Sequence, residues 1–454
     1  VISVAVLTGA LIIGDSVSFS LKKLVDRRLG NIVYVLTTGD RFVSSQLSMK
    51  ISKDLDISAA SILLLEGIAI VTENNTRANK VQLLGIDNEF WKLSNTSFPQ
   101  LSNNEVIISS NLANKLNLGI GQQILLRIRN AQLVPIDAPF TSNEEQSIAL
   151  RMTIKDIAND EKFGRFSLRN NQAAPYNVFI NKEILGKKME LPDLANIIVL
   201  DGGEHVNQDE LNTSLKSNMS LGDYGLKLNE IVETDEIELT STRVFIDKTI
   251  SNKVTSTNIP NETILSYFVI AFTNNDKEVP YSFVSAVSDN YFDQQISNNE
   301  IIINSWLADD LELKIGDSLQ LNYFAIGPLR SLQEDSSNFK IIDILPLENN
   351  TSSRMLMPDF PGLSDAGNCK DWDASIPIDL KKIRDKDEEY WNDYKGTPKA
   401  FISINKGIEL WENSFGNYTS IRFKPIVHDF TELEKDITTQ LIPEDIGLNF
   451  INVR

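Results

Sequence analysis

The alternation of apolar and polar residues along the chain predicts a mixed α/β fold. The run Val1–Ile13 is almost wholly apolar. In Ser16–Leu29 apolar residues recur at helical spacing opposite a basic face, which predicts an amphipathic helix. Apolar runs at Ile32–Leu36, Ser61–Thr72 and Val81–Ile86 predict buried strands. Strands that alternate with helices are typical of an α/β or mixed α+β architecture.

Two further helices and a last strand are predicted from shorter signals. A helix is expected over Asp40–Leu55, after the first strand. The residues Thr431–Glu434 have the composition of a capping box, so a helix is expected to start there and to reach Leu441. The apolar run Leu448–Val453 follows Gly447 and predicts a closing strand.

An internal repeat is the most informative feature of the sequence. Ser102–Leu126 and Ser297–Leu321 align without a gap, and 14 of the 25 positions are identical. Each copy has strand residues, then two leucines one helical turn apart, and then a glycine, Gly121 or Gly316, that permits a tight turn with positive φ. This match predicts a duplicated strand–helix–turn–strand unit.

Weaker echoes flank the repeat in the same order. Leu83–Trp91 corresponds to Val284–Phe292, and Pro175–Ile184 corresponds to Pro398–Ile408 apart from one residue of length. We therefore expect a helical segment over residues 1–30, a first unit over 31–222 and a second unit over 223–454. The polar segments Asp201–Ser220 and Ser251–Asn261 are expected to be surface loops.

Composition excludes some partners. The formal net charge of −19 repels phosphate backbones and anionic lipid headgroups, so binding of nucleic acid or membrane surfaces by charge is not expected. The single cysteine, Cys369, cannot form an intramolecular disulfide, so the redox compartment stays open.

The apolar start of the chain is too short to span a membrane by itself. As a helix, Val1–Ile13 would be about 20 Å long, whereas a bilayer core is roughly 30 Å thick. We interpret the segment as the outer end of a transmembrane helix that continues into a stalk. A buried N-terminal strand or helix is the alternative interpretation.

Motifs that carry chemistry are absent from the sequence. It has no GxxxxGK[ST], GxSxG, HExxH or CxxC pattern, so no catalytic, cofactor-binding or metal-binding residues are predicted. Gly119 and Gly121 resemble the start of a dinucleotide loop, but the third glycine is missing, and we interpret them as turn residues.

One acidic run has the spacing of a calcium loop. Asp385, Asp387 and Glu389 alternate, but Tyr390 stands where such a loop requires glycine. We therefore predict a solvated acidic helix start in this region.

Other isolated candidates are also better explained without chemistry. Asp371 and Asp373 have the composition of paired glycosidase acids, but nothing else marks a sugar cleft. His205 and His428 are expected at the surface, and Cys369 is expected to be an ordinary semi-buried thiol.

Several segments resemble FtsX-like and MacB-like permeases of ABC transporters. The segments Gly14–Leu21 and Gly39–Phe42 resemble the region that follows the first transmembrane helix of these permeases. Leu112–Gly121 and its copy Leu307–Asp317 resemble a stretch of MacB-type periplasmic core domains. Pro361–Phe415 is similar to large permeases with long extracytoplasmic loops, and Leu448–Arg454 resembles the return to the next transmembrane helix.

The resemblance implies two MacB-type periplasmic core units behind a helical stalk, in a permease that works with a cytoplasmic ABC ATPase. It places the domain outside a bacterial inner membrane, where it would pass ATP-driven motion outward or help export a substrate, with a second permease copy or a periplasmic partner. It implies no catalytic residues and no cofactor. The presence of two copies departs from the simple MacB pattern. The alternatives are a secreted or lipid-anchored binding protein and a hydrolase with a nonstandard site.

Overall fold

Two large β-sheets with the same strand order dominate the computed structural model, one in each of two compact units. Unit 1 comprises Val1–Ala131, Glu145–Asp223 and Gly447–Arg454, and unit 2 comprises Gln132–Glu144 and Tyr224–Ile446. The structure describes residues 2–73, 76–94, 96, 98–129, 133–134, 147–169, 173–203, 206–257, 259–326, 332–347, 351–364, 366–372, 377–424 and 430–454.

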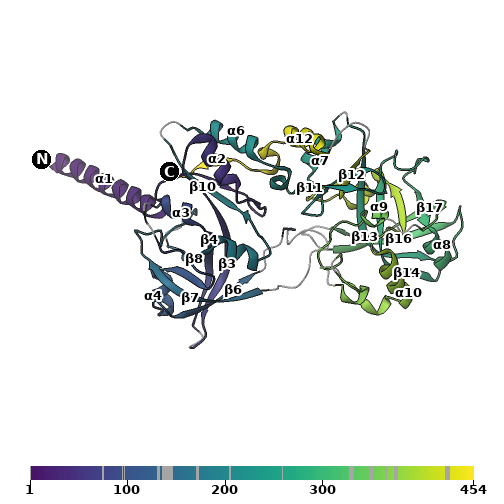
Figure 1. The fold of residues 1–454 in the computed structure, drawn as a ribbon, viewed down its shortest axis with the longest axis horizontal. Coiled ribbons are helices and arrows are strands. Elements are labelled where there is room, and N and C mark those ends of the chain that lie inside the picture. Colours follow the sequence, from purple (N-terminus) through teal and green to yellow (C-terminus); the bar gives the residue numbers. More distant parts are fainter. Residues whose placement is uncertain are drawn as a thin grey trace. The chain divides into compact units, whose positions relative to one another are not determined.

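The large sheet of unit 1 has the strand order β20-β1-β10-β3-β4-β8-β5-β7-β6, and β3 pairs with β6 as well. Its strands are β1 (Ile32–Thr37), β3 (Ala59–Val71), β4 (Thr76–Ile86), β5 (Glu105–Ser109), β6 (Gln123–Arg129), β7 (Ser147–Ala158), β8 (Tyr176–Asn181), β10 (Ile197–Asp201) and β20 (Phe450–Asn452); β2 (Val43–Ser44) and β9 (Leu194–Ala195) form a separate pair. The helices are α1 (Ile2–Leu29), α2 (Leu47–Leu55), α3 (Asn88–Lys92), α4 (Ser110–Leu116), α5 (Lys182–Lys188) and α6 (Gln208–Asn218). Helix α1 projects from this unit, and the chain's N-terminus lies at its free end (Figure 1).

The sheet of unit 2 has the order β11-β12-β19-β13-β14-β18-β15-β17-β16, and β13 pairs with β16 as well. Its strands are β11 (Leu226–Ile231), β12 (Glu236–Ser241), β13 (Asn261–Asn274), β14 (Lys277–Val287), β15 (Glu300–Asn304), β16 (Ser318–Ile326), β17 (Leu332–Leu345), β18 (Ala400–Ser403) and β19 (Ser420–Phe423). The helices are α7 (Lys248–Thr255), α8 (Ser305–Leu311), α9 (Thr351–Arg354), α10 (Asp385–Tyr394), α11 (Ile404–Trp411) and α12 (Phe430–Gln440). Strand for strand, the two sheets match, so the predicted duplication and mixed α/β class are confirmed.

The repeated segment folds in the same way in both units. Helix α4 ends at Asn117 with φ 53°, and helix α8 ends at Glu312 with φ 55°. The glycines that follow, Gly121 and Gly316, have φ values of 83° and 98°, which confirms the predicted positive-φ turn. The backbone N–H of Gly121 donates to Ile154 at 2.8 Å, and that of Gly316 donates to Ile341 at the same distance.

The edge strands of the two sheets do not follow the order of the repeats. Strand β11 comes after α6 of unit 1 but pairs with β12 of unit 2, whereas β20 comes after α12 of unit 2 but pairs with β1 of unit 1. The sheet of unit 1 is therefore completed only by the last residues of the chain.

Two sequence-based boundaries were wrong. The helix expected over Asp40–Leu55 begins only at Leu47, because Val43–Ser44 form strand β2 with β9. Helix α12 begins at Phe430, so Thr431 lies within the first turn and does not cap the helix. The segments Asp201–Ser220 and Ser251–Asn261, expected to be loops, contain helix α6 and the end of helix α7. The predicted closing strand is present as β20.

Candidate functional site

The junction between helix α1 and strand β1 joins the two segments that the sequence predicts as a stalk and as the first buried strand. Helix α1 runs without interruption from Ile2 to Leu29, through Gly14. The predicted continuity of the stalk is therefore confirmed, although glycine costs about 1 kcal/mol in a helix interior. Leu11, Ile12 and Ile13 expose 62–67% of their surface, so these three apolar side chains are open to the surroundings of the helix. Across the described chain, no helix combines the length and apolarity that crossing a membrane requires.

A glycine ends the helix. The N–H of Gly30 donates to the carbonyl of Asp26 at 2.8 Å, and Gly30 has φ 55°, a conformation that favours glycine. A Cβ atom at this position would lie 2.6 Å from the carbonyl oxygen of Leu93 and 2.8 Å from the ring of Phe163. The next residue, Asn31, donates its N–H to the same Leu93 oxygen at 2.8 Å. The turn from helix to strand is thus tightly enclosed.

A cluster of buried aromatic residues holds the junction against the sheet. Leu29 and Ile32, on either side of the turn, are fully buried in the same core cluster as Phe90, Phe163 and Phe166. The rings of Phe90 and Phe163 are 5.0 Å apart, and those of Phe90 and Phe166 meet edge to face at 5.2 Å. Such ring pairs and the buried area around them stabilise one position of the helix end.

The last residue of the chain binds the end of α1. The Arg454 guanidinium pairs with the Asp26 carboxylate at 3.0 Å, donates to the Ile32 carbonyl at 2.9 Å, and donates to the Gly30 carbonyl. The N–H of Val453 donates to the carbonyl of Val33 at 2.9 Å. The last residues of the chain therefore meet the C-terminal end of α1 and the start of β1 in unit 1, and Figure 1 shows the C-terminus beside this end of the helix.

The acidic candidates do not form a metal site. Asp385 starts helix α10, as predicted, but Asp387 is buried and accepts from the Arg384 guanidinium at 2.7 and 2.6 Å, so the expectation that this helix start is solvated was wrong for Asp387. Among the described residues no group of potential metal ligands comes together. Asp371 lies in a short 3-10 turn, η3 (Cys369–Asp371), and its exposed carboxylate accepts from the Asn368 side chain at 3.0 Å.

The remaining candidate residues have simple outcomes. Asp373, His205 and His428 lie outside the residues that the structure describes. Cys369 is buried rather than semi-buried, and burial raises the pKa of its thiol to about 12, so the thiolate is scarce at neutral pH. Gly119 and Gly121 lie in the turn between α4 and β6.

The sequence did not reveal the partners of the junction. Phe163 and Phe166 lie in a segment after β7 without periodic pattern. Arg454 follows the expected closing strand Leu448–Val453 and was singled out only as the end of the segment that resembles a return to the next transmembrane helix. The only sequence signal for this aromatic cluster was the pair of phenylalanines, Phe163 and Phe166, three residues apart in an otherwise polar stretch.

One family model matches the first part of the chain. Residues 1–208 match the model of the MacB-like periplasmic core domain. No curated protein matches the sequence. Among solved structures, the chain is similar to the periplasmic region of MacB from Actinobacillus actinomycetemcomitans, with 12% identity and a TM-score of 0.29 over 52% of this chain and 97% of that one.

Two further solved structures are similar to the chain, with comparable sequence identities and TM-scores. The extracellular domain of the noncanonic ABC-type transporter YknZ from Gram-positive bacteria has 10% identity and a TM-score of 0.27, over 41% of this chain and 94% of that one. A domain of a putative permease protein from Porphyromonas gingivalis has 15% identity and a TM-score of 0.25, over 40% of this chain and 80% of that one.

Proposed function

Residues 1–208 belong to the MacB-like periplasmic core domain family, and from this premise we propose that the chain is the extracytoplasmic part of an ABC-transporter permease. In this proposal residues 1–30 are the membrane-side helix and stalk, and 31–222 and 223–454 are two periplasmic core-like units, except that Gly447–Arg454 join the first unit. The partner is a cytoplasmic ABC ATPase, with a second permease copy or a periplasmic protein as a further partner. The domain faces the periplasm from the inner membrane, and it passes ATP-driven motion outward to move a substrate.

The observation that carries the proposal is the enclosed junction of α1 and β1. A helix transmits movement only if its end is fixed to the body that it moves. Here Gly30 has no free space around it, Leu29 and Ile32 are fully buried, and Arg454 binds the helix end. The exposed apolar residues Leu11–Ile13 give α1 the character of a helix that emerges from lipid.

A flexible insertion in α1 tests this proposal. Four Gly-Ser residues inserted after Asp15, in the complete permease, break the helix between its apolar start and the junction. We expect loss of transport while the ATPase still binds, because tilting the membrane end then no longer moves β1. The matched control is the same insertion after Glu73, in the connection between β3 and β4, which is away from the junction.

Transport measured in the two insertion variants decides whether α1 couples the membrane to unit 1. Full transport in the Asp15 insertion would contradict mechanical coupling through α1. Loss of transport in both insertions would attribute the effect to general disturbance of unit 1, and would also count against the proposal.

A further inference from the structure

The two large sheets receive their edge strands from each other's part of the chain. Strand β11 follows helix α6 of unit 1 and is the edge strand of unit 2, whereas β20 follows helix α12 of unit 2 and is the edge strand of unit 1. Since β20 pairs with β1 and β11 pairs with β12, the two strands take equivalent places. Correct pairing therefore requires a difference between two sheets of equal strand order.

The connections that lead into these strands do not supply the difference. Each contains a short 3-10 turn, η1 (Leu221–Tyr224) or η5 (Pro443–Ile446). In each turn an aspartate accepts from the backbone N–H three residues before it, at 2.8 and 3.0 Å. A glycine with positive φ follows, Gly225 at 74° and Gly447 at 76°, and the next residue is a leucine in both copies. Equal connections cannot select between equal sheets.

One row of side chains across four strands does differ between the sheets. In unit 1 the residues of this row, called here the apolar row, are Ile451 of β20, Val35 of β1, Val199 of β10 and Ala60 of β3. In unit 2 the residues of the charged row are Asn229 of β11, Glu238 of β12, Arg422 of β19 and Glu262 of β13. In each row, neighbouring residues are direct partners across adjacent strands.

The registers of the two sheets show that the rows are equivalent. Counted outward from the repeated strands β5 and β15, the register passes through β8 and β4 in unit 1 and through β18 and β14 in unit 2. It reaches Leu64 of β3 and Ser266 of β13 at the same step. Ala60 and Glu262 each lie four residues before these positions. The duplication therefore changed a whole row from apolar to charged, or the reverse.

The charged row is buried. Glu238, Arg422 and Glu262 expose 1%, 2% and 5% of their surface. The Arg422 guanidinium pairs with Glu238 at 3.1 Å and with Glu236 at 3.6 Å. Lys424 pairs with Glu262 at 2.7 Å. Burial raises the pKa of Glu238, and Arg422 opposes that rise. Because charges lose their hydration on burial, such a row adds little stability over apolar residues of similar volume.

The residue that packs near the row changes in parallel. In unit 1, Phe90 belongs to the buried cluster that contains the three central residues of the apolar row. The sequence repeat places Tyr291 at the same position in unit 2. Burial raises the pKa of Tyr291 to about 12, and Arg422 lowers it in opposition, so this phenol lies near the charged row. A polar ring thus accompanies the polar row.

We propose that these rows select the edge strand of each sheet, so that the charged row of unit 2 takes Asn229 of β11 and rejects Ile451 of β20. The Asn229 amide donates to the Thr240 hydroxyl of β12 at 3.3 Å. An isoleucine at that place would bring an apolar side chain beside a buried carboxylate, which is costly. The apolar row has the reverse preference, because isoleucine packs against valine and the side chains of that row offer an amide no hydrogen bond.

Disulfide trapping in the full chain tests the selection. Cys369 is replaced by alanine, and Asn452→Cys in β20 is combined with Tyr34→Cys, its partner in β1, or with Ile237→Cys, at the equivalent place in β12. Each protein is refolded from urea and oxidised, and a gel separates links within one chain from links between two copies. With the charged row intact, we expect the first pair to link and the second pair to stay unlinked.

Replacing the charged row by the residues of unit 1 should remove the selection. In the triple variant Glu238→Val, Arg422→Val and Glu262→Ala, linking of the second pair is expected to rise at least about tenfold, because β20 then meets the same apolar row in both sheets. The matched control is Ser266→Ala with Ser285→Ala, which removes a buried hydroxyl pair 2.6 Å apart from the same sheet. The second pair should stay unlinked in this control.

Linking of the first pair alone in the triple variant would overturn the proposal. Equal linking of the second pair in the control would attribute it to loosened packing of the sheet, with the same consequence. If the triple variant fails to fold, Glu238→Gln with Arg422→Met and Glu262→Gln keeps the shapes, removes the charges and is tested in its place. Failure of both variants to fold would mean that the row sustains the fold of unit 2 and selects nothing, which also contradicts the proposal.

Discussion

Gly30 shows how a single residue fixes the helix end to the sheet. Its φ of 55° is strained for any residue with a side chain, and a Cβ would also overlap the Leu93 carbonyl and the Phe163 ring. We expect Gly30→Ala to destabilise unit 1 by about 2–4 kcal/mol, because strain and overlap add. Chemical denaturation measures the change.

Gly39 is the matched control for this substitution. It also has a positive φ, 66°, but a Cβ there would meet no atom within 4 Å. Gly39→Ala is expected to cost only about 1 kcal/mol, from the backbone conformation alone. Equal losses in the two variants would show that the enclosure of Gly30 has no energetic consequence.

Lys399 makes the stability of unit 2 depend on pH. Its pKa is lowered to about 7 in the folded protein by burial, and it returns to its ordinary value on unfolding. Between pH 7 and about 10 the unfolded chain binds a proton that the folded chain does not, so wild type loses stability as pH falls through this window, by about 1.4 kcal/mol per pH unit. Below pH 7 the loss is complete and constant.

Removing the amine should remove this dependence. Lys399→Met is expected to gain stability relative to wild type as pH falls from 10 to 7, and the gain should level off below pH 7. Urea unfolding at pH 6, 7, 8.5 and 10 measures it. A difference between the two proteins that stays constant over this range would contradict the lowered pKa.

At the scale of elements, strand β20 is the test of how the units are built. Phe450 is fully buried and pairs with Leu36 of β1, although more than two hundred residues of unit 2 lie between their parts of the chain. Phe450→Ala is expected to cost unit 1 about 3–4 kcal/mol, since a large buried ring is lost. Hydrogen exchange of β1 and β10 should then accelerate, while exchange of β12 and β19 stays unchanged.

The neighbouring residue supplies the control. Ile451 lies in the same strand with 45% of its surface exposed, so Ile451→Ala should change exchange little. Faster exchange of β12 in the Phe450 variant would mean that the last strand does not belong to the fold of unit 1.

Much of each unit could be predicted from the sequence, because the signals for its strands, helices and turns lie within short segments of the chain. The repeat at Ser102–Leu126 contains its own strand, helix and turn, so spacing within 25 residues was sufficient to predict it. The strands around Ile32, Ser61 and Val81 have apolar runs that are long enough to read. The start of α2 was misplaced because Val43–Ser44 pair with a strand about 150 residues away.

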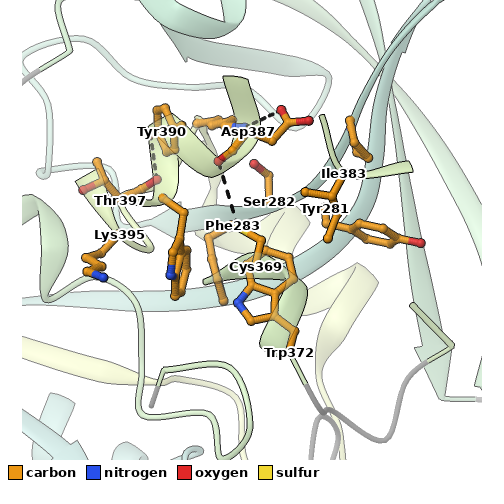
Figure 2. A pocket seen from close by; sticks show the side chains of 13 residues that line it. Tyr281, Ser282, Phe283, Cys369, Trp372, Ile383, Asp387, Tyr390, Lys395 and Thr397 are labelled. Atoms are coloured by element: carbon orange, nitrogen blue, oxygen red, sulfur yellow. Dashed lines mark hydrogen bonds and ion pairs between the residues drawn. The ribbon is translucent and has the colours of Figure 1, made fainter. Parts of the chain in front are cut away.

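Contacts between distant segments could not be predicted, because the signals in the sequence are confined to short segments. Nothing in the spacing of Arg454 or Phe163 shows that either meets Gly30, because contacts between distant segments leave no periodic pattern. The small cavity lined by Trp372, Trp391 and Lys399 (Figure 2) was missed as well, since these residues meet only when the long segment between β17 and β18 folds against β14. Asp387 was predicted to be exposed to solvent. An arginine three residues earlier in the sequence gives no signal that the two side chains pair in a buried place.

For the whole molecule, charge is divided unequally between the units. Unit 2 contains 40 of the 62 acidic residues but only 20 of the 43 basic residues, so unit 1 has 22 acidic and 23 basic residues. The net charge of −19 thus lies almost wholly on unit 2. Unit 1, which carries α1 and both ends of the chain, is nearly neutral. In the proposed function unit 1 lies next to the membrane, and its neutrality removes the repulsion from anionic lipids that the overall charge predicts.

The central claim is that unit 1 moves as one body with α1. The most direct measurement is the distance between spin labels on Ser20→Cys in α1 and Arg151→Cys in β7, with Cys369 replaced by alanine, in the complete permease with its ATPase. Both labelled residues are exposed, and the pair Lys53→Cys and Arg151→Cys within unit 1 is the control. We predict one narrow distance distribution, as narrow as that of the control, and the same in the nucleotide-free and vanadate-trapped states. A broad distribution, or a distance that changes between these states while the control stays fixed, would contradict the claim.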